Sequence, residues 1–160
     1  MKKLLFFFCF FLMAISAGAQ IKLSYDHSGT EFVFKRCVRS GKNVNIDFSF
    51  SNLSTTDYNV FFDGFNAIAF DDEGYDYKPY GINDDGTHYI KEITIGGRTF
   101  RPEAHDFRIG FFLPADVTTK VRVVLANVDD YATQIKVFKL RVGEGGKYNL
   151  DVRNIPIAEK

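Results

Sequence analysis

The sequence predicts an all-β protein, an antiparallel β-sandwich of about seven to nine short strands, with a small closed β-barrel as the alternative. Three observations support this prediction. Apolar and polar residues alternate in several segments, turn dipeptides separate these segments at regular intervals, and no window of a dozen residues beyond residue 19 has a helical period. Without helices to connect parallel strands, we expect the strands to pair antiparallel.

The clearest strand is Asn43–Asn52. Its apolar residues fall on one face: Val44, Ile46, Phe48 and Phe50. Its polar residues fall on the other: Asn45, Asp47, Ser49 and Ser51. This period of two predicts a strand with one face in the core and the other in water.

Further segments have a similar but weaker pattern. They are Glu31–Arg39, Tyr58–Phe62, Ala67–Phe70, Tyr89–Ile95, Arg98–Arg101, the run with Phe107, Ile109 and Phe111, the run with Val121, Val123 and Leu125, Gln134–Val142, and Lys147–Val152. In Glu31–Arg39 the apolar residues do not all fall on one face of the expected strand, so its phase is mixed. Gln134–Val142 begins on Ile135 and Val137 and then changes phase to Phe138, which predicts a β-bulge inside that strand.

Dipeptides that are typical of turns separate these segments. The turn dipeptides are Ser40-Gly41, Asp63-Gly64, Glu73-Gly74, Asp85-Gly86, Gly96-Gly97, Asp129-Asp130 and Gly145-Gly146. Glycine supplies the positive φ that hairpin turns require. The only helical feature that we expect is a single turn near Ala115–Thr118.

Residues 1–19 have the three-part layout of a secretory signal peptide. Lys2 and Lys3 precede an apolar run, and small residues end at Ala19, which predicts cleavage before Gln20. The apolar run is shorter than the roughly 20 residues that span a bilayer. We therefore expect an exported protein, in the periplasm or at the surface of a Gram-negative cell, with residues 20–160 as one domain and no membrane span after cleavage.

The net charge of the chain bears on its possible partners, and its cysteine content on a possible reactive thiol. The chain has 20 basic and 20 acidic residues, and residues 1–19 contain two of the basic ones. A nearly neutral protein lacks the basic surface that nucleic-acid binding requires, so we expect no nucleic-acid partner. Beyond residue 19 the only cysteine is Cys37, which we expect to be a small buried residue of a strand.

Three stretches, VNIDFSFSNLSTTDYNV, IAFDDEGYDYKP and FRIGFFLPADVTTKVRVVL, resemble those of secreted bacterial immunoglobulin-like sandwich domains. The resemblance covers roughly residues 43–142 and places Asn52 at a strand end, Asp71–Tyr77 in an acidic-glycine-aromatic hairpin, and Pro114 before a long core strand. It implies an immunoglobulin-like sandwich that binds a partner or acts as a structural spacer. The chain departs from antibody domains because it has no tryptophan and no cysteine pair.

The stretch FDDEGYDY, continued by KPYGINDDGTHY, is the strongest candidate for a binding site. It combines a run of carboxylates with half of the chain's tyrosines, and tyrosine gives rigid contact area in binding loops. The candidate binding residues are Asp71, Asp72, Glu73, Tyr75, Asp76, Tyr77, Tyr80 and Tyr89. A purely structural turn, with Gly74 at positive φ, is the alternative interpretation.

A calcium site is a further interpretation of the same carboxylates, but the spacing does not fit a helix-loop-helix calcium loop. With Gly74 as the sixth loop residue, the first ligand would be Ala69, which has no side-chain oxygen. The three histidines, His27, His88 and His105, lie far apart, and no catalytic sequence motif occurs. We therefore predict no metal, no cofactor and no catalytic residue.

Together these observations predict an exported, non-catalytic binding or structural module of the cell envelope. Its expected partner is a protein or glycan, recognised through the tyrosine- and aspartate-rich stretch Asp71–Tyr89. Two alternatives remain open at this point: an enzyme or enzyme inhibitor with a site assembled from distant residues, and a calcium-stabilised adhesion domain.

Overall fold

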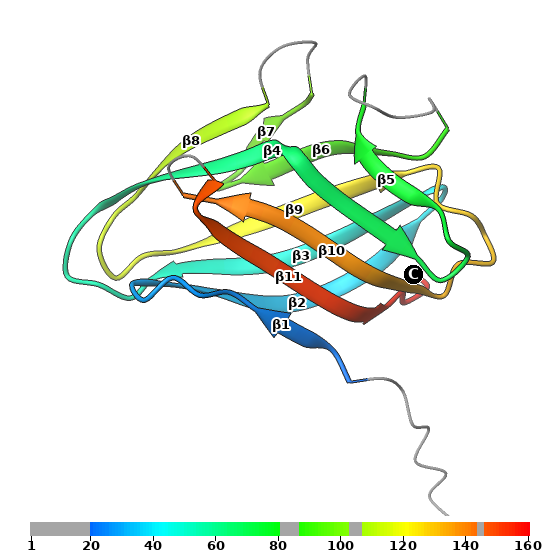
Figure 1. Ribbon diagram of the computed structural model, residues 1–160, viewed down its shortest axis with the longest axis horizontal. Coiled ribbons are helices and arrows are strands. Elements are labelled where there is room, and N and C mark those ends of the chain that lie inside the picture. Colours follow the sequence, from blue (N-terminus) through cyan, green and yellow to red (C-terminus); the bar gives the residue numbers. More distant parts are fainter. Residues whose placement is uncertain (1–19, 81–86, 103–106, 144–145) are drawn as a thin grey trace, which may run out of the picture.

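The computed structural model describes residues 20–80, 87–102, 107–143 and 146–160, and these residues form an all-β fold (Figure 1). No helix occurs among them. The predicted signal peptide, residues 1–19, lies outside the described residues. The strands are β1 (Lys22–Ser24), β2 (Thr30–Ser40), β3 (Asn43–Asn52), β4 (Tyr58–Asp71), β5 (Asp76–Pro79), β6 (Tyr89–Ile95), β7 (Arg98–Phe100), β8 (Arg108–Leu113), β9 (Thr118–Ala126), β10 (Gln134–Val142) and β11 (Tyr148–Pro156).

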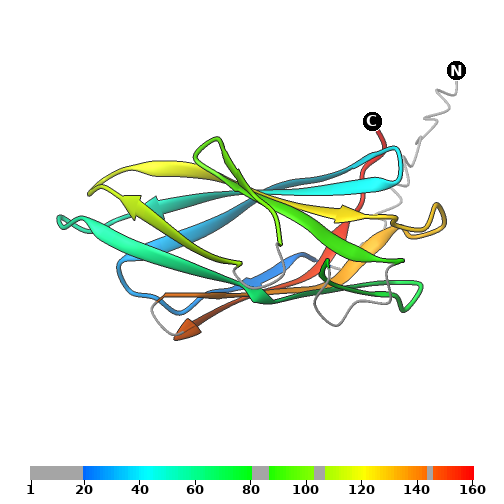
Figure 2. The same cartoon turned by 90° about the horizontal axis from the view of Figure 1, so that it is seen from above.

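The strands form one mixed sheet that curls into two layers and is nearly closed into a barrel. One layer contains β1, β11, β10 and β4, and the other contains β6, β9, β3 and β2; Figure 2 shows the two layers edge-on. β5 joins the layers because it pairs with β4 on one side and β6 on the other. At the other edge, the backbone of Ala158 bonds to Cys37 and Arg39 of β2. The all-β prediction is confirmed, and the shape lies between the predicted sandwich and the barrel alternative.

Phenylalanine side chains from both layers fill the space between them. Phe48 and Phe50 of β3 are almost completely buried, as the alternation in Asn43–Asn52 predicts. Phe48 stacks on Phe138 of β10 at 5.8 Å, and Phe50 contacts Phe62 of β4 edge-on at 5.5 Å. Aromatic pairs in these geometries add to the stabilisation that apolar burial provides, so these rings hold the two layers together.

The predicted change of phase in Gln134–Val142 is a β-bulge. The register of β10 against β4 shifts between Ile135 and Val137, and afterwards Phe138 points inward again. The mixed phase of Glu31–Arg39 has the same origin, because the register of β2 against β3 shifts between Phe34 and Arg36. A bulge adds one residue to a strand and so turns the following side chains to the other face.

The structure corrects the prediction of a turn at Asp63-Gly64. Tyr58–Phe62 and Ala67–Phe70 belong to one strand, β4, which continues through Gly64. The ring of Phe107 occupies the space where a Cβ on Gly64 would lie. Gly64 therefore permits a close approach of a core ring rather than a reversal of the chain.

The expectation of purely antiparallel pairing is also wrong at one place. β5 and β6 pair in parallel, with Lys78 beside Tyr89 and Pro79 beside Ile90. β5 returns antiparallel along the end of β4, and residues 80–88 then lead to β6, which runs in the same direction as β5. The prediction failed because it considered parallel strands only with helical crossovers, whereas this pair is only two residues long.

A search of the described residues for a membrane-spanning segment found no helix with the length and apolar character to cross a bilayer.

Candidate functional site

The turn between β4 and β5 contains the first of the predicted binding residues, Asp71. Its side chain is 3% exposed. Oδ1 accepts hydrogen bonds from the N–H groups of Glu73 (3.1 Å) and Tyr75 (2.9 Å), and Oδ2 accepts one from the Tyr77 hydroxyl (2.6 Å). Gly74, at φ 94°, completes the turn. Asp71 therefore holds the turn together from inside and presents no oxygen to a partner.

Asp72 connects this turn to the start of β10. Its carboxylate accepts hydrogen bonds from the Thr133 hydroxyl (2.5 Å) and from the N–H groups of Thr133 and Gln134 (3.0 and 3.1 Å). Partial burial would raise the pKa of Asp72, but these hydrogen bonds favour the charged form and the net pKa is lowered. Asp72 thus fixes the turn to the neighbouring loop.

The remaining predicted residues are more accessible, with one exception. Glu73 is exposed, and Asp76 is partly exposed and forms an ion pair with Lys78 at 2.6 Å. Tyr75 is 41% exposed and packs on His88 with ring centroids 4.2 Å apart. Tyr80 is 54% exposed and packs on Tyr89 at 4.8 Å. The exposed tyrosines therefore form two aromatic pairs, one at each end of β5.

Tyr77 is the exception, because its side chain is fully buried in the core. Burial raises the pKa of Tyr77, and the hydrogen bond that it donates to Asp71 raises it further. The ring supplies no contact area to a partner. Truncation of Tyr77 is consequently expected to destabilise the fold rather than a binding surface.

No group of three or more His, Cys, Asp or Glu residues is placed to hold a metal ion within the described ranges. The adjacent carboxylates of Asp71 and Asp72 illustrate the reason. They bind different protein donors, one inside the turn and the other in the neighbouring loop. They do not converge on one point as calcium ligands would.

Cys37 lies in β2 with 3% exposure, as predicted. Burial raises the pKa of its thiol to about 12, so the thiol is protonated and unreactive at neutral pH. His105 lies outside the described residues.

His27 lies at a small cavity of about 100 Å³ at the start of β2. Its Nδ1 accepts a hydrogen bond from the Gly29 N–H (3.1 Å) and lies 3.0 Å from the Thr30 hydroxyl. The ring also packs edge-on against Tyr148 at 4.4 Å. These contacts fix the entry into β2, and the hydrogen bond to Gly29 occupies the nitrogen that a general base would use.

A larger cavity than the one at His27 lies on the outer face of β2, β3 and β9, beside the β6–β7 turn. This groove has a volume of about 620 Å³. Its lining residues are Lys35, Arg36, Asp47, Phe48, Ser49, Thr94, Gly97, Thr118, Thr119, Lys120, Val121 and Arg122. We call it the outer-face groove.

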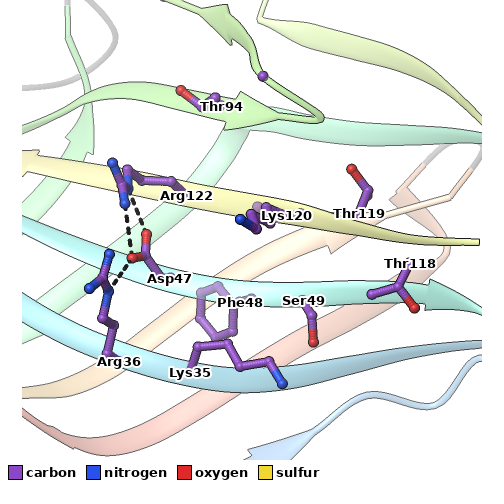
Figure 3. Close-up of a pocket in the computed structure, with 12 residues that line it drawn as sticks. Lys35, Arg36, Asp47, Phe48, Ser49, Thr94, Thr118, Thr119, Lys120 and Arg122 are labelled. Atoms are coloured by element: carbon purple, nitrogen blue, oxygen red, sulfur yellow. Dashed lines mark hydrogen bonds and ion pairs between the residues drawn. The ribbon is translucent and has the colours of Figure 1, made fainter.

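Cross-strand register places an arginine–aspartate–arginine trio in the outer-face groove (Figure 3). Asp47 of β3 pairs with Arg36 of β2 on one side and with Arg122 of β9 on the other. Arg36 Nε donates to Asp47 Oδ2 at 2.7 Å, and Arg122 donates to both carboxylate oxygens at 2.6 and 3.0 Å. Partial burial would raise the pKa of Asp47, but the two guanidinium groups outweigh it and lower the pKa. The carboxylate therefore stays ionised and orients both arginines.

Comparison with protein-family models, curated proteins and solved structures gave no match to this chain.

The outer-face groove was not predicted from the sequence, although two signals point to it. Lys120 and Arg122 lie two residues apart in a strand and so share its outer face. Lys35 and Arg36 are adjacent, and adjacent strand residues normally point to opposite faces. The bulge in β2 turns both of them outward. The irregular alternation in Glu31–Arg39 indicated a bulge but did not show which residues it turns outward.

Proposed function

We propose that this protein is an exported, non-catalytic binding module of the cell envelope. Its recognition surface consists of the exposed Tyr75 and Tyr80, the partly exposed Tyr89, and the charged neighbours Glu73 and Asp76. The proposal of export rests on the signal-peptide pattern of residues 1–19. Kinship with secreted immunoglobulin-like domains is part of the same proposal and rests on the short sequence stretches quoted above.

The observation that supports this surface best is the combination of exposed rings with a fixed backbone. Asp71 and Asp72 hold the turn before β5 with hydrogen bonds to four backbone N–H groups, the Tyr77 hydroxyl and the Thr133 hydroxyl. A loop that is ordered before binding loses less conformational entropy when a partner binds. Tyrosine adds large contact area with few rotatable bonds.

The proposed recognition surface is small enough for a single partner to cover it. Tyr80 follows Tyr75 by five positions, and an extended chain of this length spans at most about 17 Å. A standard protein interface covers about 800 Å² on each partner, so it is large enough to include both aromatic pairs. The partner is a protein or glycan of the envelope.

The test combines Tyr75→Ala, Tyr80→Ala and Tyr89→Ala in one variant and measures capture of partners from the native envelope fraction. Buried tyrosines at interface centres contribute strongly, so we expect at least about a 100-fold loss of affinity for the captured partner. The matched control is Phe112→Ala, which removes a 56% exposed ring from β8, near the opposite end of β4. Wild-type capture by the triple variant, or an equal loss in the control, would refute the surface.

The export part of the proposal has its own measurement. We expect protein recovered from the periplasm or medium of the native cell to begin at Gln20. An unprocessed N-terminus on mature, cell-associated protein would contradict it.

A further inference from the structure

We propose that the outer-face groove is a second binding site, which takes an acidic polysaccharide through its carboxylate or sulfate groups. It lies on the faces of β2, β3 and β9, away from the tyrosines around β5. Four cationic side chains line it, Lys35, Arg36, Lys120 and Arg122, against the single carboxylate of Asp47. Since the chain as a whole has as many acids as bases, this excess of positive charge is local.

Lys35, Lys120 and Arg36 each have donors that no residue in the described ranges uses. Lys35 and Lys120 form no ion pair with any residue that the structure describes, whereas Asp47 engages both arginines. Arg36 contacts Asp47 through Nε, and neither of its terminal nitrogens has a hydrogen bond within the described part of the chain. The groove can therefore offer two ammonium groups and one oriented guanidinium group to an anion.

The bulge in β2 is the feature that builds this arrangement. It places Lys35 and Arg36 on the same outer face, opposite the strand that carries Lys120 and Arg122. Cations thus line both sides of the groove with β3 between them. In a regular strand adjacent side chains point to opposite faces, so only one of these two cations would lie in the groove. The irregularity of β2 is therefore directly connected to the charge of the groove.

The uncharged lining favours a sugar chain over other polyanions. Ser49, Thr94 and Thr118 contribute hydroxyl groups. Those of Thr94 and Thr118 also bond to Thr99 and Ser51, and a hydroxyl with one such bond can still accept a hydrogen bond from a sugar hydroxyl. The one lining residue with a ring, Phe48, is 2% exposed. Single-stranded nucleic acid binds through bases stacked on exposed aromatic rings, which the groove does not offer.

The test measures binding of a hexameric oligogalacturonate and of its methyl ester, which has the same sugars without the charges. We expect the acid to bind, the ester to bind at least about tenfold more weakly, and the affinity for the acid to fall with added salt. Lys35→Gln combined with Lys120→Gln should weaken binding of the acid by at least about tenfold. Lys120→Arg should retain it, because it keeps the charge.

The matched control is Lys22→Gln with Lys136→Gln, which removes two exposed lysines from the other layer. It should bind as the wild type does. Equal binding of acid and ester, equal loss in the control, or no binding of the acid at low salt would each overturn the proposal. Equally tight binding of oligothymidylate, lost in the same variant, would overturn the preference for a polysaccharide. Because the test variant leaves Tyr75, Tyr80 and Tyr89 intact, its result is independent of the tyrosine surface.

Discussion

The turn after β4 and the outer-face groove each contain an aspartate with several hydrogen bonds, but the two carboxylates perform different roles. Asp71 is buried and binds groups within six residues of itself, so it stabilises one turn. Asp47 lies at the surface and binds arginines that are 11 and 75 residues away. The acidic cluster that is conspicuous in the sequence is partly structural. The cluster around Asp47 is brought together by strand register, which the sequence alone does not give, and it lies in a groove that can hold a ligand.

The largest expected effect concerns Asp71. Asp71→Ala leaves the Tyr77 hydroxyl buried without an acceptor and removes the acceptor of two N–H groups, so we expect a loss of about 3 kcal/mol in the free energy of unfolding. Urea denaturation would measure it. Tyr77→Phe is the control, because it removes one hydrogen bond and keeps the ring; its loss should be smaller. If Asp71→Ala is as stable as the wild type, the carboxylate does not hold the turn.

This contrast shows which parts of the molecule the sequence could predict. The strand Asn43–Asn52 was predicted with its bounds, because alternation between core and water is a local property of a strand. The bulge in β10 was predicted for the same reason. β1 and β5 were not, since strands of three and four residues are too short for a pattern and depend on their neighbours.

The candidate site was predicted less well than the fold, and for a physical reason. Composition identified Asp71 and Tyr77 as binding residues, but the sequence does not state which way a side chain points once a turn is closed. It also does not give the register between β2, β3 and β9, which brings Arg36, Asp47 and Arg122 together. Contacts between distant strands depend on the whole fold.

An effect of intermediate size is expected at acidic pH, where the pKa values of Asp72 and Asp47 are both lowered by folding. A depressed pKa in the folded state stabilises the fold above the pKa of the unfolded chain, and this contribution is lost as the pH falls through the folded value. We therefore expect stability to decrease as the pH drops below about 4.

Variants assign this acid sensitivity to its residues. Melting temperatures measured between pH 6 and 2.5 should fall less steeply with acid for Asp72→Asn than for the wild type, because the amide cannot be protonated in this range. Glu73→Gln is the matched control, since Glu73 is an exposed acid of the same turn. Identical slopes for the wild type and Asp72→Asn would show that the Asp72 carboxylate does not couple folding to pH.

The smallest expected effect concerns Asp47 in the outer-face groove. Asp47→Asn breaks ion pairs whose arginines are 63% and 44% exposed, and such pairs contribute little to stability in water. We expect a loss below about 1 kcal/mol by urea denaturation, well under that of Asp71→Ala. A loss as large as that of Asp71→Ala would show that the trio is a structural brace, and the groove would then resemble the turn instead of contrasting with it.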